Sequence, residues 1–427
     1  MTEPPWKSDT AGVARTLERT VLSHPRSVAA IRWVMIGIYL VLILLPPLLP
    51  APPPHASAFS NFRSLAQFAI WAMWWPFVSL STLLFGRMWC GLLCPEGALA
   101  SIASKYGSNQ QPPRWMTAGA VPLLAFIGIT IVGQLLEVDE EPDGQLLVLG
   151  GSTLLAIGVS LYYRRNWWIW CRYLCPVSLL FGVFSRLGIM YFAVNRPLLA
   201  LNERNAPSGK QPCPVGIHLP VLSTNRSCLM CFRCAGYKNA IHLRLRHPGE
   251  ELGRIESADP LFWEVIFLFG GAIGLPMGVF LGERFDWSGS HLVILLLGSS
   301  FCAILVLSTL TWLSGAFASR SSQMATQDRL LRFSTLGYVF TPISLFSLFL
   351  GLSQPTFEQF ARAGLPSWLQ LALRVALLGT GLVWSLRLVA KSRPTTERLQ
   401  SRSVARLVPL SLGVLLVFGV WSFIIFA

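Results

Sequence analysis

Eight of the nine cysteines in the chain occur in close-spaced groups, and these groups are the residues best suited to chemistry. Thiolates bind iron–sulfur clusters, zinc and copper, and neighbouring thiols can also cycle through disulfides. The ninth cysteine, Cys302, stands alone in an apolar stretch, where we expect it to pack. The grouped cysteines are Cys90, Cys94, Cys171, Cys175, Cys213, Cys228, Cys231 and Cys234.

The densest group is the segment CLMCFRC, residues 228–234. Its C-x2-C-x2-C spacing is the first part of the cysteine run of bacterial ferredoxins. In two-cluster ferredoxins, the cysteine that precedes proline ligates the cluster of the other run, and Cys213, followed by Pro214, fits this role. We therefore expect one [4Fe-4S] cluster, bound by Cys213, Cys228, Cys231 and Cys234. A structural zinc site is the alternative, although zinc favours paired C-x2-C groups.

The pattern W-C-x3-C-P occurs twice, at Trp89–Pro95 and 81 residues later at Trp170–Pro176. The two cysteines of each copy are four residues apart, so on a helix both would face one side. Each copy follows a long apolar run, and the proline after the second cysteine should break the helix there. The four thiols could therefore converge on one site at one membrane depth. These are Cys90, Cys94, Cys171 and Cys175.

Three interpretations of this four-thiol set stay open. It could be a metal-binding or redox site, for copper or a second cluster, because soft thiolates suit both. It could instead be two disulfides that cycle with a partner. The cysteines could also be small residues that pack where helices cross, since free cysteine behaves as a small hydrophobe. Duplication of the whole pattern favours the first interpretation.

The elements that must position these residues are membrane helices. Of the 427 residues, 53% are hydrophobic and 13% are charged, whereas about 25% are charged in ordinary soluble domains. The apolar residues form blocks of bilayer length, which predicts an all-α polytopic membrane protein. The nine predicted spans are Val28–Leu49, Leu65–Gly86, Thr117–Leu136, Gln145–Tyr163, Phe262–Leu281, His291–Leu313, Phe333–Leu352, Trp368–Val389 and Leu407–Phe426.

The distribution of Lys and Arg predicts the orientation. With the N-terminus inside, nearly all basic clusters fall on the inner side, as the positive-inside rule requires, and the acidic loop Glu137–Gly144 falls outside. The net charge of +14 thus indicates membrane topology, and no nucleic-acid partner is expected. The predicted domains are a cytoplasmic tail (1–27), a membrane domain with the twin motifs (28–194), a cytoplasmic ferredoxin-like 4Fe-4S domain (195–260) and a C-terminal membrane domain (261–427).

These motifs together resemble the polyferredoxin-like membrane proteins of the NosR/NapH/CcoG type. The resemblance covers about residues 65–245 and rests on the twin C-x3-C-P motifs, on CPVGIHLP at Cys213–Pro220 and on CLMCFRC. It implies a bacterial inner-membrane protein with cytoplasmic [4Fe-4S] centres. The chain departs from the family in the single cluster expected and in its additional C-terminal spans, which give a loose similarity to the ferredoxin-like component of bacterial iron-transport systems.

The expected function is electron transfer, from a cytoplasmic or quinol donor to a membrane or periplasmic metal centre or reductase. The alternative is a subunit for iron or copper uptake or assembly that handles metal through its cysteines. No general acid, nucleophile or phosphate-binding loop is apparent, so we expect a component of a redox or metal-reductase system without catalytic residues of its own. The expected surroundings are the lipid of the inner membrane, with a redox or metal-transport partner.

Overall fold

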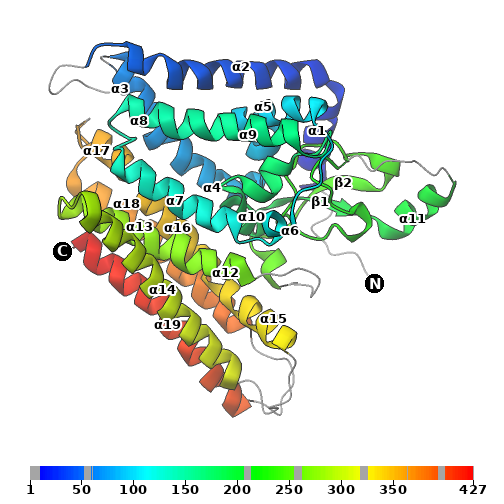
Figure 1. The fold of residues 1–427 in the computed structure, drawn as a ribbon. Coiled ribbons are helices and arrows are strands. Elements are labelled where there is room, and N and C mark those ends of the chain that lie inside the picture. Colours follow the sequence, from blue (N-terminus) through cyan, green and yellow to red (C-terminus); the bar gives the residue numbers. More distant parts are fainter. Residues whose placement is uncertain are drawn as a thin grey trace. The chain divides into compact units, whose positions relative to one another are not determined.

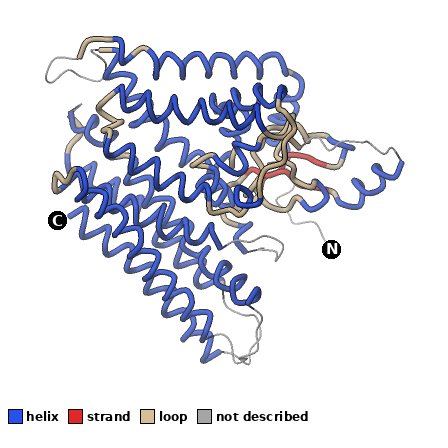
Figure 2. The backbone as a smooth tube through the Cα atoms, in the orientation of Figure 1, coloured by secondary structure: helices blue, strands red, loops and turns tan. Residues whose placement is uncertain are grey.

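The computed structural model describes residues 10–51, 59, 61–205, 213–253, 262–317, 326–362, 364–392 and 400–426. Helices dominate these residues (Figure 1). The described part contains only two strands, β1 (Met190–Val194) and β2 (Ile241–Leu245), which pair antiparallel with Phe192 opposite Leu243 (Figure 2). The predicted all-α membrane fold with a small ferredoxin-like insert is confirmed.

Eight helical segments of the described chain are long and apolar enough to cross a membrane. They correspond to eight of the nine predicted spans. The ninth, predicted at Thr117–Leu136, is the shorter helix α7 (Val121–Leu135), whose 15 residues extend about 22 Å at 1.5 Å per residue. It is short because Gly119 (φ +87°) before it and Glu137 (φ +46°) after it adopt left-handed backbone, which interrupts a helix.

By internal contacts the chain forms two compact units. Unit 1 comprises Met1–Leu48, Ser81–Pro122 and Leu146–Glu251, and unit 2 comprises Leu49–Leu80, Leu123–Gln145 and Leu252–Ala427. Unit 1 contains all eight grouped cysteines. The domain scheme predicted from the sequence divides the chain along its length, whereas these contacts join distant segments.

Unit 1 combines membrane helices with the small sheet. Helix α1 packs on β2 and α5 on α9 (Figure 1). Glu18 of α1 anchors that helix, because its carboxylate accepts from the backbone N–H of Leu243 at 2.7 Å and contacts His242 at 3.0 Å. The helices of this unit are α1 (Thr10–Ser23), α2 (Pro25–Leu44), α5 (Pro95–Ala103), α6 (Arg114–Thr117), α9 (Gly151–Tyr162), α10 (Ser178–Phe184) and α11 (Arg196–Asn205).

Unit 2 is a bundle whose inner helices bury aromatic side chains. Trp421 donates from Nε1 to Ser347 Oγ at 2.7 Å, and the Phe269 and Phe340 rings meet edge to face with centroids 5.2 Å apart. Its helices, with α4 and α7 extending across the boundary, are α3 (Phe62–Gln67), α4 (Trp75–Phe85), α7, α8 (Pro142–Gln145), α12 (Phe262–Phe269), α13 (Leu275–Arg284), α14 (Gly289–Phe317), α15 (Thr326–Gly337), α16 (Thr341–Leu352), α17 (Gln354–Arg362), α18 (Ser367–Lys391) and α19 (Gln400–Phe426).

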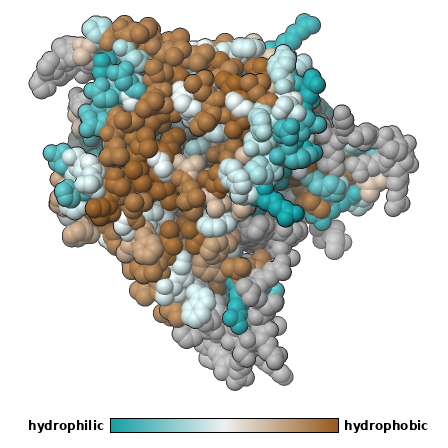
Figure 3. Space-filling model, viewed as in Figure 1, coloured by the Kyte–Doolittle hydropathy of each residue, from teal (hydrophilic) through white to brown (hydrophobic). Residues whose placement is uncertain are grey.

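The outward faces of the long helices are apolar. On α2, Val34 is 58% exposed, and on α14, Phe301 is 67% exposed. Figure 3 shows apolar residues in brown over the sides of the helices. Such continuous apolar surface is far larger than soluble monomers expose, so these faces meet lipid, and the chain is a multi-pass membrane protein.

Candidate metal centres

The first W-C-x3-C-P copy forms a π-helical turn followed by a sharp helix start. The turn covers Trp89–Leu93 and ends as the N–H of Cys94 donates to the carbonyl of Trp89 at 2.8 Å. Cys94 itself is extended and caps α5, accepting on its Sγ from the N–H of Gly97 at 3.3 Å. Pro95 stands at the first helical position, where its missing N–H costs nothing. Single π-turns are rare and often mark functional sites.

The second copy repeats this geometry. A π-helical turn covers Trp170–Leu174, and the N–H of Cys175 donates to the carbonyl of Trp170 at 2.9 Å. Cys175 is again extended, with φ −54° and ψ +123°. The duplication in sequence is therefore a duplication in structure.

The two copies pack crosswise on each other. A Cβ added at Gly107 would lie 2.5 Å from the carbonyl oxygen of Tyr163, and one at Gly188 would lie 2.9 Å from that of Thr82. Gly107 and Gly188 are equivalent in the repeat, and so are Thr82 and Tyr163. Each copy thus ends against the helix that leads into the other copy, which brings the two π-turns together.

Two of the four thiols of the twin motifs lie beside Gly97. A Cβ at this residue would lie 3.5 Å from Cys94 Sγ and 3.6 Å from Cys171 Sγ, so glycine leaves the space beside these sulfurs unfilled. Burial, followed by the charges of Cys90 and Glu96, raises the pKa of Cys171 to about 12. The pKa of Cys175 is also raised, by burial and then by the charges of Glu96 and the other three thiols.

Glu96 belongs to the same site, although the sequence did not single it out. Its Oε1 accepts from Ser152 Oγ of α9, the helix that leads into the other copy, at 2.5 Å. Burial raises the pKa of Glu96 to about 7, against the lowering effects of Ser152 and of Trp170 in the other copy. The carboxyl group therefore links the two copies.

The 228–234 loop adopts backbone that is unusual for its residues. Met230 (φ +52°) and Phe232 (φ +60°) lie in the left-handed region, which costs bulky residues about 1–3 kcal/mol each. Alternating backbone of this kind gathers N–H groups into a concavity typical of iron–sulfur sites. Here the N–H of Met230 bonds to Cys228, and that of Arg233 bonds to Cys231.

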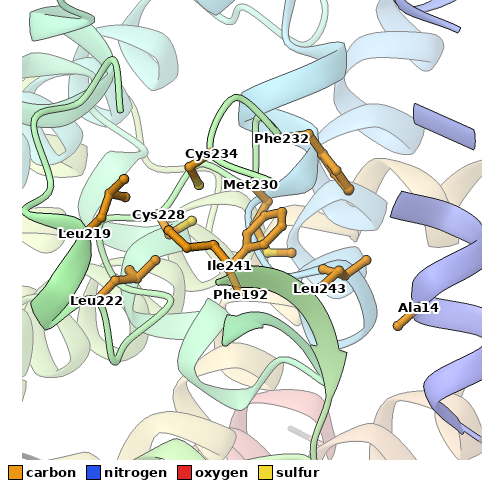
Figure 4. Packing of buried hydrophobic residues seen from close by; sticks show 10 residues of the cluster. All are labelled: Ala14, Phe192, Leu219, Leu222, Cys228, Met230, Phe232, Cys234, Ile241 and Leu243. Carbon is orange, nitrogen blue, oxygen red and sulfur yellow. The ribbon is translucent and has the colours of Figure 1, made fainter. Parts of the chain in front are cut away.

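Cys213 and the three loop cysteines form the second four-thiol set. Burial, together with the charges of Cys231 and Cys213, raises the pKa of Cys228 to about 12, against the hydrogen bond from the N–H of Met230. The pKa of Cys234 is also raised, first by burial and then by the charge of Cys228. Figure 4 shows Cys228 and Cys234 close together among Leu219, Leu222 and the strand residues.

The two sets lie directly against each other. Gly91, inside the first π-turn, packs on the 228–234 loop so closely that a Cβ would lie 2.2 Å from Leu229 O and 2.8 Å from Cys231 Cα. Cysteines of both sets also pack in and around one buried cluster with Trp168 and Leu229. These cysteines are Cys90, Cys171, Cys175, Cys213 and Cys231.

The residues fit an iron–sulfur cluster in each set. Buried thiols with raised pKa values keep their protons until a cation replaces them. The four thiols of the twin motifs and the three of the 228–234 loop are of this kind. Gly97 leaves open the space that a cluster needs, and N–H groups reach Cys94, Cys228 and Cys231. Among the described residues, no three His, Cys, Asp or Glu side chains group about the position of a single metal ion.

Two arginines at this site were missed by sequence reasoning. Arg32 of α2 donates to the carbonyl oxygens of Gly91 and Leu92, and Arg87 donates to Arg226 O at 2.8 Å and bonds to Cys90. A signal for Arg32 was present, since a charge within an apolar helix is a functional hypothesis by default. Arg87 had no such signal beyond its place before the first motif.

Comparisons with known proteins agree with this geometry. The 4Fe-4S binding domain family matches residues 67–113 and 147–191, which contain the two W-C-x3-C-P copies. No solved structure matches the chain.

Two curated proteins are similar over part of the chain. Regulatory protein NosR of Pseudomonas aeruginosa is 28% identical over 126 residues, which cover 24% of this chain and 17% of that protein. Protein NirI of Paracoccus denitrificans is 25% identical over 180 residues, which cover 38% of this chain and 26% of that protein. The chain thus spans about a sixth of the length of NosR and about a quarter of the length of NirI. Neither is named for iron transport, so the expected likeness to iron-uptake systems has no support. The chain is a multi-pass membrane protein that matches the 4Fe-4S binding domain family at its twin motifs and is similar to NosR and NirI over part of its length.

Proposed function

We propose that the chain is an electron-transfer protein of the bacterial inner membrane. It would take electrons from a cytoplasmic or quinol donor and deliver them to a membrane or periplasmic metal centre or reductase. The observation that carries this proposal is the contact of Gly91 with the backbone of Cys231. It supports the proposal because the backbones that carry the two four-thiol sets lie against each other, and single electrons can pass between neighbouring centres.

In this proposal each set of thiols binds one [4Fe-4S] cluster. Cys213, Cys228, Cys231 and Cys234 form one ligand set, supported by the ferredoxin spacing and by the N–H groups of the loop. Cys90, Cys94, Cys171 and Cys175 form the other, supported by the family match at the twin motifs. A bound cluster supplies reversible one-electron chemistry.

The protein's own residues prepare both sites. The buried cluster around Trp168 and Trp170 excludes water from the thiols. The N–H groups of Gly97, Met230 and Arg233 orient three of the sulfurs, and hydrogen bonds to ligand sulfurs tune such centres. The basic segments around these residues support a cytoplasmic location by the positive-inside rule.

The iron and acid-labile sulfide content of the purified chain tests this assignment. Two clusters require about eight of each per chain. Cys228→Ala and Cys94→Ala should each lower the content to about four, because each removes a ligand from one set only. Cys302→Ala is the matched control, since this cysteine is exposed on α14, and it should leave eight. A wild-type chain without acid-labile sulfide would contradict the proposal.

A further inference from the structure

Arg32 faces thiols of both sets. Its guanidinium is held by the carbonyls of Gly91 and Leu92, between the two sites. Its charge acts on Cys231 of the one set and on Cys171 and Cys94 of the other. The guanidinium carbon also lies 5.7 Å from the ring centre of Trp168, over which Arg233 lies at 4.8 Å.

Arg87, which directly precedes the first copy, also faces thiols of both sets. Its side chain is only 4% exposed. It bonds to Cys90, and its charge also lowers the pKa of Cys171 and of Cys228, against burial. Its position is fixed by the bond from Nη1 to Arg226 O, and a Cβ at Gly182 would lie 3.7 Å from that Nη1.

Both arginines lack an acidic partner. In the described part of the chain neither forms an ion pair with a carboxylate. The Nε of Arg87 is buried without a hydrogen bond there. A buried cation without a compensating charge is costly, so these positions call for an anion. Among the described residues, the ionisable acidic groups that these two arginines act on are thiols of the two sets.

We propose that Arg32 and Arg87 are shared counter-charges of the two thiolate sites, so that each arginine sets the reduction potential of both sites. This inference rests on the proposed function. When a chemical reductant such as dithionite gives one electron to a site, the site gains one negative charge. A nearby cation stabilises that reduced form. Because each arginine faces both sets, its loss disfavours the reduced form at both.

Redox titration of the full-length loaded protein, followed by EPR, tests the inference. It is carried out in the wild-type chain and in Cys228→Ala and Cys94→Ala, which each keep one site. Arg32→Gln and Arg87→Gln should each lower the ratio of reduced to oxidised protein about tenfold at fixed potential, which is about 59 mV for one electron. The shift should occur at both sites.

Two other arginines serve as controls. Arg233 is exposed and its charge acts on Cys231, so Arg233→Gln should shift the potential of the 228–234 site alone. Arg63 pairs with Glu141 in the other unit, so Arg63→Gln should shift neither.

Several results would overturn the inference. The inference would be wrong if both Arg32→Gln and Arg87→Gln shifted the reduction potential of one site only. It would also be wrong if neither variant shifted a reduction potential. If Arg87→Gln loses iron, Arg87→Lys replaces it, because lysine keeps the positive charge. In Arg87→Lys the ratio of reduced to oxidised protein should stay within about twofold of the wild-type ratio at both sites. Arg32→Gln tests the inference independently of Arg87. Failure of the proposed function would look different, because the wild-type chain itself would then lack iron and sulfide.

Discussion

At the scale of single residues, the sites depend as much on glycine as on cysteine. In our proposal the eight thiols supply the ligands, and Gly97 leaves the space beside Cys94 and Cys171 unfilled. Burial raises the pKa of Cys94 and Cys171, so a metal group that binds there would replace their protons. Met230 and Phe232 have left-handed backbone in the loop where the N–H groups of Met230 and Arg233 meet sulfur.

A larger side chain at Gly97 should therefore prevent the twin-motif thiols from binding their cluster. We expect Gly97→Val to lower iron and sulfide by about four per chain, because its side chain would occupy the position beside two sulfurs. Gly158→Val is the matched control, since a Cβ there meets nothing within 4 Å, and it should retain the wild-type content. Full iron content in Gly97→Val would show that this space is not used.

At the scale of elements, the π-turns and their crosswise packing assemble the site. Each π-turn ends at a cysteine that precedes proline, Cys94 or Cys175. The backbone of this cysteine is extended, so the helix stops there. The first turn then rests on the 228–234 loop through Gly91. This contact joins an element of the membrane domain to the ferredoxin-like loop.

Gly91→Ala should disrupt that contact. Its methyl group would meet the backbone of Leu229 and Cys231 at 2.2 and 2.8 Å, and backbone cannot yield as a flexible side chain can. Overpacking of this kind costs about 1–3 kcal/mol, so the midpoint of thermal unfolding should fall by several degrees. Gly158→Ala, at an open position, should leave the midpoint unchanged. An unchanged midpoint in Gly91→Ala would mean that the loop can move away freely.

At the scale of the whole molecule, helix α7 decides the topology. Its 15 residues are fewer than the roughly 20 that a bilayer usually requires, yet the loop that follows it contains no Lys or Arg between residues 136 and 145, which favours the outer side by the positive-inside rule. If α7 crosses, the residues before and after it face opposite sides.

Labelling of introduced cysteines tests this topology. We expect an impermeant thiol reagent to label Glu140→Cys in intact cells, and Lys105→Cys only after the membrane is opened. Both positions are exposed, so protection cannot come from burial. The chain without either substitution measures labelling of the native thiols. Protection of Glu140→Cys in intact cells would show that α7 does not cross.

The sequence by itself determined the grouping of the cysteines, the repeat and the helical membrane fold. Eight of nine spans were predicted because apolar blocks of bilayer length have few alternatives. The break after Cys94 and Cys175 followed from proline, which cannot continue a helix interior. The shortening of α7 was missed because left-handed backbone at Glu137 has no clear signal in a residue of that type.

Only the tertiary structure decided which groups meet. Arg32 and Cys231 are separated by almost two hundred residues, and nothing in local propensity or spacing relates them. The two thiol sets come into contact because Gly91 allows one backbone to touch another, and Arg87 becomes a neighbour of both sets because its side chain reaches the carbonyl of Arg226, just before the 228–234 loop. Such contacts depend on how whole elements fill space, which the pattern of residues along one element does not encode.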